Sequence, residues 1–67
     1  MTTIPSQAFT NVPSGRSVVV EETEPTHSFI HLLLATDGGV SSVLLTPAQT
    51  QALAAALTAR VELLERR

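Results

Sequence analysis

The sequence predicts an α+β fold in which a three-stranded antiparallel β-meander is followed by one carboxyl-terminal α-helix, in the order β-β-β-α. A β-branched run, RSVVVEET, begins at Arg16, and HLLLATDGGVSSVLL at residues 31–45 has the pattern of a hairpin around Asp-Gly. The sequence TPAQ then opens a stretch of strong helix formers that reaches the carboxyl end. We therefore expect residues 16–67 to form a single two-layer domain, with the helix packed across the sheet.

The small size of the chain limits how it can be stabilised. A domain of 67 residues is near the lower limit for folding alone, and such domains usually rely on disulfides, a metal or oligomerisation. The chain has no cysteine, which excludes disulfides, and its two histidines are too few for a typical structural zinc site. We expect no metal and no cofactor, so a homodimer is the predicted source of stability.

Composition and motifs also argue against several classes of function. The formal net charge is −2 and the four basic residues are all arginines, which is not the footprint of a nucleic-acid-binding domain. No G-x-S-x-G elbow, P-loop or G-x-G-x-x-G is present, so we expect no enzyme activity. The longest apolar run, Leu32 to Ala35, is far shorter than the ~20 residues that span a bilayer, so no membrane association is expected.

The first fifteen residues, MTTIPSQAFTNVPSG, show neither a strand nor a helix period. Two prolines, a glycine and many small polar residues favour an extended, flexible arm at residues 1–15. Ile4, Phe9 and Val12 are spaced along this arm. Two interpretations remain open, namely a loose tail and an arm that docks on a neighbouring surface.

The first predicted strand begins at Arg16 and is rich in valine. Val18 and Val20 share one face of this strand, whereas Val19 and Glu21 share the other. The polar segment EETEPTH at residues 21–27 contains a proline and three glutamates, and it is predicted to be a solvated connection to the next strand.

The hairpin pairs residues 28–36 with residues 40–45. A type I′ turn, with positive φ at Asp37 and Gly38, would place Thr36 opposite Gly39, whereas a slip to Gly38-Gly39 would remix the two faces. In the first register, one face carries Ile30, Leu32, Leu34, Val43 and Leu45. The opposite face carries Phe29, His31, Leu33, Ala35, Val40, Ser42 and Leu44. Either register leaves both faces apolar, and one helix covers only one of them.

The helix has a clear start at Thr46 as N-cap, Pro47 as its first residue and Gln49 at the third position of a capping box. At about 100° per residue, one stripe suited to cover the sheet consists of Leu53, Leu57, Val61 and Leu64, flanked by Ala54. A second arc consists of Ala48, Ala52, Ala55, Ala56, Ala59 and Leu63. This alanine arc is either an exposed helix-forming surface or a helix–helix contact across a dimer.

The candidate interface combines the second hairpin face with the alanine arc. Its residues are Phe29, His31, Leu33, Val40, Leu44, Ala52, Ala56, Ala59 and Leu63. His31 is the histidine within a strand, and we interpret it as an interface or rim residue in preference to a base or metal ligand. His27, four residues earlier, is expected to project in a divergent direction.

The stretch VLLTPAQTQALAAAL at residues 43–57 resembles a strand, L-T-P and alanine-rich helix pattern in small uncharacterised proteins of actinobacteria and their bacteriophages. The resemblance implies no catalytic residues. It implies a phage-encoded or accessory protein that acts by binding a host protein. Because the amino terminus shows neither a positive n-region nor an apolar h-region, we expect a location in the cytoplasm of a bacterial host cell.

These observations give one main functional hypothesis and two alternatives. The main hypothesis is a small, non-enzymatic, homodimeric protein-interaction module that binds or modulates a host protein. The first alternative is a small transcriptional regulator or nucleic-acid-binding accessory protein that uses the arginines of the dimer. The second is a structural or assembly protein whose amino-terminal arm docks on a neighbouring subunit.

Overall fold

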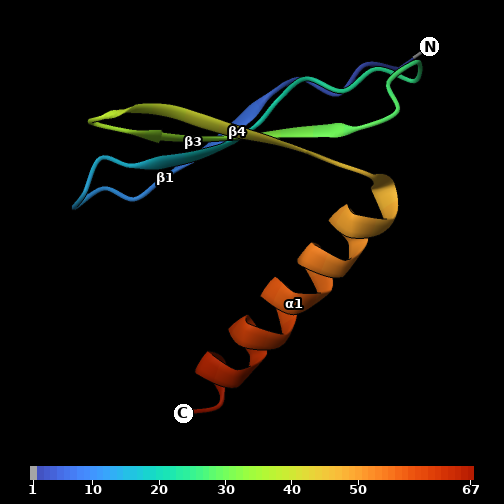
Figure 1. Ribbon diagram of the computed structural model, residues 1–67. Helices are drawn as coiled ribbons and strands as arrows, with labels where there is room; N and C mark the ends of the chain where they lie inside the picture. The colour runs from blue at the N-terminus through green and yellow to red at the C-terminus, as the bar shows by residue number, and fades with distance from the viewer. Residues whose placement is uncertain (1) are drawn as a thin grey trace.

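The computed structural model describes residues 2–67 and contains one antiparallel sheet and one helix (Figure 1). The four strands follow one another across the sheet in sequence order. They are β1 (Gln7–Thr10), β2 (Ser17–Val20), β3 (Ile30–Thr36) and β4 (Gly39–Leu45), and the helix is α1 (Pro47–Glu65). The predicted α+β class, with an antiparallel sheet and one carboxyl-terminal helix, is confirmed.

The predicted number of three strands is wrong, because β1 forms within the segment where the sequence indicates a flexible arm. Phe9 lies opposite Val18 in the β1–β2 ladder, and Ile4 forms a further isolated bridge with Thr23. A strand of four residues between two prolines has too few positions to show a period of two. The backbone groups of Gln7 and Phe9 are satisfied by pairing with β2, a long-range interaction that the local sequence pattern does not report.

Of the two registers that the sequence allowed, the β3–β4 hairpin has the first, with Thr36 opposite Gly39 and Ile30 opposite Leu45. The predicted type I′ turn is wrong, since Gly15 and Gly39 are the only residues of 2–67 with positive φ, at 70° and 131°. The Thr36 hydroxyl supports the turn instead. It accepts a hydrogen bond from the Gly38 N–H and donates one to the Gly39 carbonyl, both at 3.3 Å.

The register divides the sheet into two faces, and both carry apolar side chains. We call the face toward α1 the inner face, to which the strands contribute Phe9, Val18, Val20, Ile30, Leu32, Leu34, Ser41, Val43 and Leu45. The outer face carries Ala8, Val19, His31, Leu33, Ala35, Val40, Ser42 and Leu44. The alternation of inward and outward side chains along each strand therefore holds across the whole sheet.

The helix begins with the predicted capping box. The Thr46 hydroxyl accepts a hydrogen bond from the Gln49 N–H at 3.1 Å, and the Gln49 side-chain carbonyl accepts one from the Thr46 N–H at 2.9 Å. Pro47 occupies the first helical position, where its missing N–H costs no helical hydrogen bond. Because Thr46 is the single residue between β4 and α1, the cap also fixes where the chain leaves the sheet.

The helix does not lie flat across the sheet. It starts at the end of β4 and runs obliquely away below the inner face (Figure 1). None of the residues 2–67 is buried, so the expected two-layer core is not closed within one chain. The Cα radius of gyration is 13.8 Å, against about 11 Å for a compact domain of this length.

Candidate protein interface

An apolar groove separates the inner face from the first half of α1. Its volume is about 450 Å³. The residues that line this inner groove are Phe9, Val18, Val20, Ile30, Leu32, Thr50, Leu53, Ala54 and Leu57. Thr50 is the one polar residue among them, and its hydroxyl donates to the Thr46 carbonyl at 2.9 Å within the helix. The groove therefore offers a partner hydrocarbon surface with almost no polar group to satisfy.

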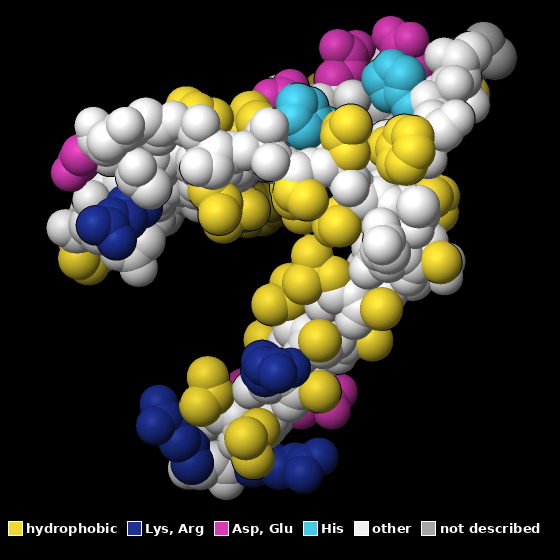
Figure 2. All heavy atoms as spheres, in the orientation of Figure 1, with side chains coloured by type: hydrophobic (Ala, Val, Ile, Leu, Met, Phe, Trp, Pro, Cys, Tyr) yellow, Lys and Arg dark blue, Asp and Glu magenta, His cyan; other side chains and the backbone are white. Residues whose placement is uncertain are grey.

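The apolar stripe of the helix continues past the inner groove. Leu53, Ala54 and Leu57 line the groove as the sequence indicates, whereas Val61 and Leu64 lie beyond it and are 53% and 55% exposed. At 19 residues, α1 is about 28 Å long, so the stripe reaches well past its attachment to the sheet. Figure 2 shows hydrophobic side chains beneath the sheet and along the helix surface that faces it.

The sheet residues of the predicted interface lie together on the outer face. In the β3–β4 ladder, His31 lies opposite Leu44 and Ala35 lies opposite Val40. Leu33 is central in β3, and Phe29 precedes that strand. Val40 and Leu44 are 66% and 57% exposed, so this part of the predicted surface is open to a partner.

The helix residues of the predicted interface, Ala52, Ala56, Ala59 and Leu63, lie apart from the sheet residues. The helix is on the inner side of the sheet, whereas the predicted sheet residues point to the outer side. Arg60 also folds back along the helix, where its Nη1 donates to the Ala56 carbonyl at 2.8 Å. The two halves of the predicted interface therefore do not form one continuous surface.

A shallower hollow lies on the outer side of the sheet, near the loop that precedes β3. Its volume is about 240 Å³, and it is lined by Glu22, His27, Ser28, Phe29, His31 and Leu44. The two histidines were expected to project in divergent directions, but both line this hollow. The loop turns back before β3, where the His27 N–H donates to the Glu24 carbonyl at 3.0 Å.

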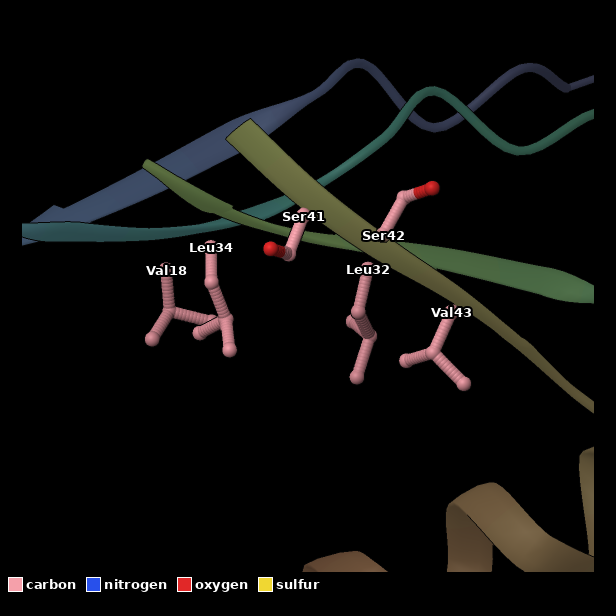
Figure 3. A pocket seen from close by; sticks show the side chains of 6 residues that line it. All are labelled: Val18, Leu32, Leu34, Ser41, Ser42 and Val43. Carbon is pink, nitrogen blue, oxygen red and sulfur yellow. The ribbon is translucent and has the colours of Figure 1, made fainter. Parts of the chain in front are cut away.

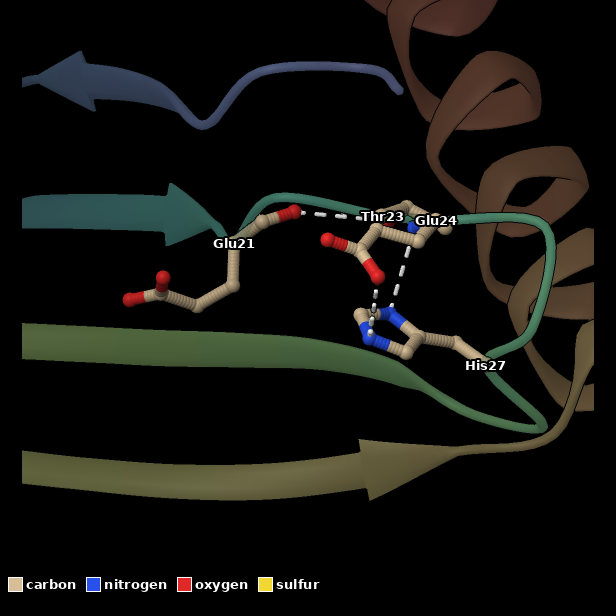
Figure 4. Close-up of polar contacts among 4 residues, drawn as sticks. All are labelled: Glu21, Thr23, Glu24 and His27. Carbon is tan, nitrogen blue, oxygen red and sulfur yellow. Dashed lines mark hydrogen bonds and ion pairs between the residues drawn. The ribbon is translucent and has the colours of Figure 1, made fainter. Parts of the chain in front are cut away.

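His27 is engaged within its own loop. Its Nδ1 accepts a hydrogen bond from the Glu24 N–H at 3.2 Å, and its Nε2 lies 3.9 Å from the Glu24 carboxylate (Figure 4). The Thr23 hydroxyl donates to the Glu21 carbonyl at 3.3 Å in the same turn. Within residues 2–67 there is no group of three or more side chains that could hold a metal ion. The positions of Glu24 and His27 beside the hollow are set by hydrogen bonds within the loop.

The strand half of the inner groove was not predicted as a site. Phe9 was assigned to the arm, and Val18 and Val20 were placed on one strand face without a partner. The signal that would have found them is Phe9, the one aromatic residue in a segment that precedes a valine-rich strand. That signal becomes useful only when the β1–β2 pairing is known.

The fold and these surfaces define a small α+β domain whose sheet and helix leave apolar surfaces uncovered in the single chain. Comparisons of the sequence and structure with protein families, with curated proteins and with solved structures gave no match. Over residues 2–67, no helix combines the length and apolar character needed to cross a membrane.

Proposed function

We propose that this chain is a homodimeric protein-interaction module without enzymatic activity. The observation that supports this function is the open core, in which the inner groove and the far half of the helix stripe are left uncovered. Apolar surface of this extent is unfavourable in water and is typical of a protein–protein interface. A second copy of the chain can cover it without any additional component.

The size of the accessible surface area also supports a dimer. The chain exposes 5485 Å², whereas a compact monomer of 7.1 kDa exposes about 4,100 Å². The excess is about 1,400 Å² per chain, compared with about 800 Å² that each partner contributes to a standard interface. Burial of this excess in a two-fold dimer would fall within the range of obligate homodimers.

A role in binding a bacterial host protein rests on the resemblance of residues 43–57 to proteins of actinobacteria and their phages. Such a role would operate in the bacterial cytoplasm and would use surface that dimerisation leaves free. Nucleic-acid binding has weaker support, because Arg66 and Arg67 share the end of the chain with Glu62 and Glu65. The negative charges of these glutamates would repel the phosphates of a nucleic acid and weaken its binding.

Sedimentation equilibrium over a range of concentrations tests the dimer. We expect the wild-type chain to sediment as a dimer at micromolar concentration. Val61→Arg, which adds a charge on the helix stripe beyond the inner groove, should shift the chain toward the monomer. Thr58→Arg is the matched control on the polar face of the helix and should leave the dimer intact.

Circular dichroism of the same variants separates loss of association from loss of folding. Because Val61 is exposed in the single chain, we expect Val61→Arg to keep its helix content. A wild-type chain that remains a cooperatively folded monomer at all concentrations would contradict the proposed function. Equal dimerisation of Val61→Arg and Thr58→Arg would show that the helix stripe lies outside the interface.

A further inference from the structure

Strand β4 is an open edge of the sheet with no protection against pairing. Its seven residues, GVSSVLL, extend for about 23 Å and include neither proline nor charge. Natural sheets usually block such an edge with a charge, a proline, a bulge or a covering segment. The opposite edge, β1, has four residues and lies between Pro5 and Pro13.

The hydrogen-bond pattern shows which β4 backbone groups face the open edge. The His31 carbonyl accepts from the Glu21 N–H at 2.9 Å, so the backbone of His31 is directed to the β2 side of β3. Backbone direction alternates along a strand, so the pair of His31 and Leu44 is a non-hydrogen-bonded pair. The N–H and C=O groups of Val40, Ser42 and Leu44 therefore point outward, away from β3.

We propose that β4 pairs antiparallel with β4 of a second copy, about a two-fold axis at Ser42, to give one continuous sheet across the dimer. This inference rests on the proposed function and specifies the interface. Ser42 lies at the centre of β4, so pairing at this residue uses the whole strand. The outward N–H and C=O groups of Val40, Ser42 and Leu44 then all pair with β4 of the second copy.

The strand is complementary to itself in this register. Ser42 faces its counterpart, and Val40 faces Leu44 of the second copy. Each of these pairs can exchange two backbone hydrogen bonds, because the N–H and C=O groups of both members point toward the partner strand. Without a charged residue in β4, no like charges are brought together.

The side chains also meet on matching faces. In Figure 3, Ser41 and Val43 project toward the helix side of the sheet and Ser42 projects to the opposite side. Pairing at Ser42 places Ser41 beside Val43 of the second copy on the inner face, and keeps Val40 beside Leu44 on the outer face. The two-fold axis is perpendicular to the sheet, so both inner faces and both helices lie on one side.

The arrangement extends the apolar inner surface across the dimer. A hollow of about 170 Å³ lies at the β4 side of the inner face and is lined by Val18, Leu32, Leu34, Ser41, Ser42 and Val43 (Figure 3). In the joined sheet this hollow is internal to the layer and no longer at its edge. The excess area of each chain is then available for burial between the two inner faces and the two helices, which lie on the same side of the joined sheet.

Disulfide crosslinking tests the register, since the chain has no cysteine of its own. Facing Cα atoms of a hydrogen-bonded antiparallel pair are about 5.5 Å apart, within the range that a disulfide spans. We expect Ser42→Cys to form a covalent dimer under mild oxidation. In Ser41→Cys, the matched control, the two cysteines would be about 8 Å apart and on the other face, and should not crosslink.

A proline variant tests the edge itself. Ser42→Pro removes an N–H that points only outward, so we expect the chain to keep its circular dichroism spectrum and to become monomeric. Should Ser42→Pro not fold, amide exchange in the wild-type chain gives the same test. Val40, Ser42 and Leu44 should be protected in the dimer and should exchange rapidly when dilution produces the monomer.

The outcomes distinguish this inference from the proposed function. A wild-type chain that is monomeric would overturn both. A wild-type dimer that persists in folded Ser42→Pro, or that leaves Ser42→Cys uncrosslinked, would overturn the β4 pairing and leave the homodimer standing. Rapid exchange of the outward β4 amides in the wild-type dimer would have the same meaning.

Discussion

Gly39 closes the β3–β4 hairpin with a φ of 131°, a conformation that side-chain-bearing residues rarely adopt. We expect Gly39→Ala to lower the free energy of unfolding by about 1–3 kcal/mol because of this backbone strain. Space is not the cause, since a Cβ at Gly39 would meet nothing within 4 Å. Urea unfolding followed by circular dichroism measures the change.

Gly38 provides the matched control for this prediction. Its φ is not positive, and a Cβ there would approach the Thr36 Oγ1 at 3.9 Å, an ordinary contact. Gly38→Ala should therefore be the milder of the two substitutions. An equal loss of stability in both variants would contradict the assignment of the strain to Gly39.

Thr46 stabilises the start of α1 through its side chain as well as its backbone. Thr46→Ala removes the hydroxyl that accepts the Gln49 N–H, and we expect a loss of about 1 kcal/mol in urea unfolding. Thr58→Ala, in the middle of the same helix, should leave stability unchanged or raise it, because alanine is the better helix former. An unchanged midpoint in Thr46→Ala would show that the cap is not formed.

At the scale of elements, β1 is the strand that local pattern did not indicate. The Asn11 N–H donates to the Arg16 carbonyl at 2.8 Å, which sets the alternation of the β1–β2 ladder. The amides of Gln7 and Phe9 then point to β2, and those of Ala8 and Thr10 point away. We expect slow hydrogen exchange at Gln7 and Phe9 and fast exchange at Ala8 and Thr10.

Nuclear magnetic resonance resolves this exchange pattern residue by residue. The amides of β3 provide the internal reference, because that strand is paired on both sides. Fast exchange throughout Gln7–Thr10 would mean that the segment behaves in solution as the flexible arm indicated by its composition. Alternating protection would instead establish the fourth strand.

The helix differs from the strands in how much of its behaviour is local. Its start, its length and its apolar stripe all follow from short-range rules, and each was predictable from the sequence. Its direction relative to the sheet was not predictable. The groove residues of the helix were thus anticipated, whereas Phe9, on the opposite wall, was not.

At the scale of the whole molecule, the chain measures 41 × 29 × 19 Å and has an open core. A protein that gains its core by association should melt at a higher temperature when its concentration is raised. We expect the wild-type Tm to rise steadily from micromolar to near-millimolar concentration in differential scanning calorimetry. The Tm of Val61→Arg should depend less on concentration, and a constant wild-type Tm would contradict association.

The sequence by itself determined the features that arise within a few residues. These are the capping box at Thr46 and the alternation that makes both sheet faces apolar, whereas the sequence allowed two hairpin registers, of which the structure has the one with Thr36 opposite Gly39. Each depends on side-chain type and on hydrogen bonds between near neighbours, which a pattern of residues records directly.

Only the tertiary structure decided the pairing of β1, the oblique direction of α1 and the surfaces that stay uncovered. These features depend on contacts between segments far apart in the chain, where many arrangements satisfy the same local pattern. The outer-face residues were therefore predicted as a group, but their separation from Ala52, Ala56, Ala59 and Leu63 was not. The physical reason is that alternation along a strand determines which side chains share a face of the sheet. The path of the helix, which depends on tertiary contacts, determines which of the two faces stays uncovered.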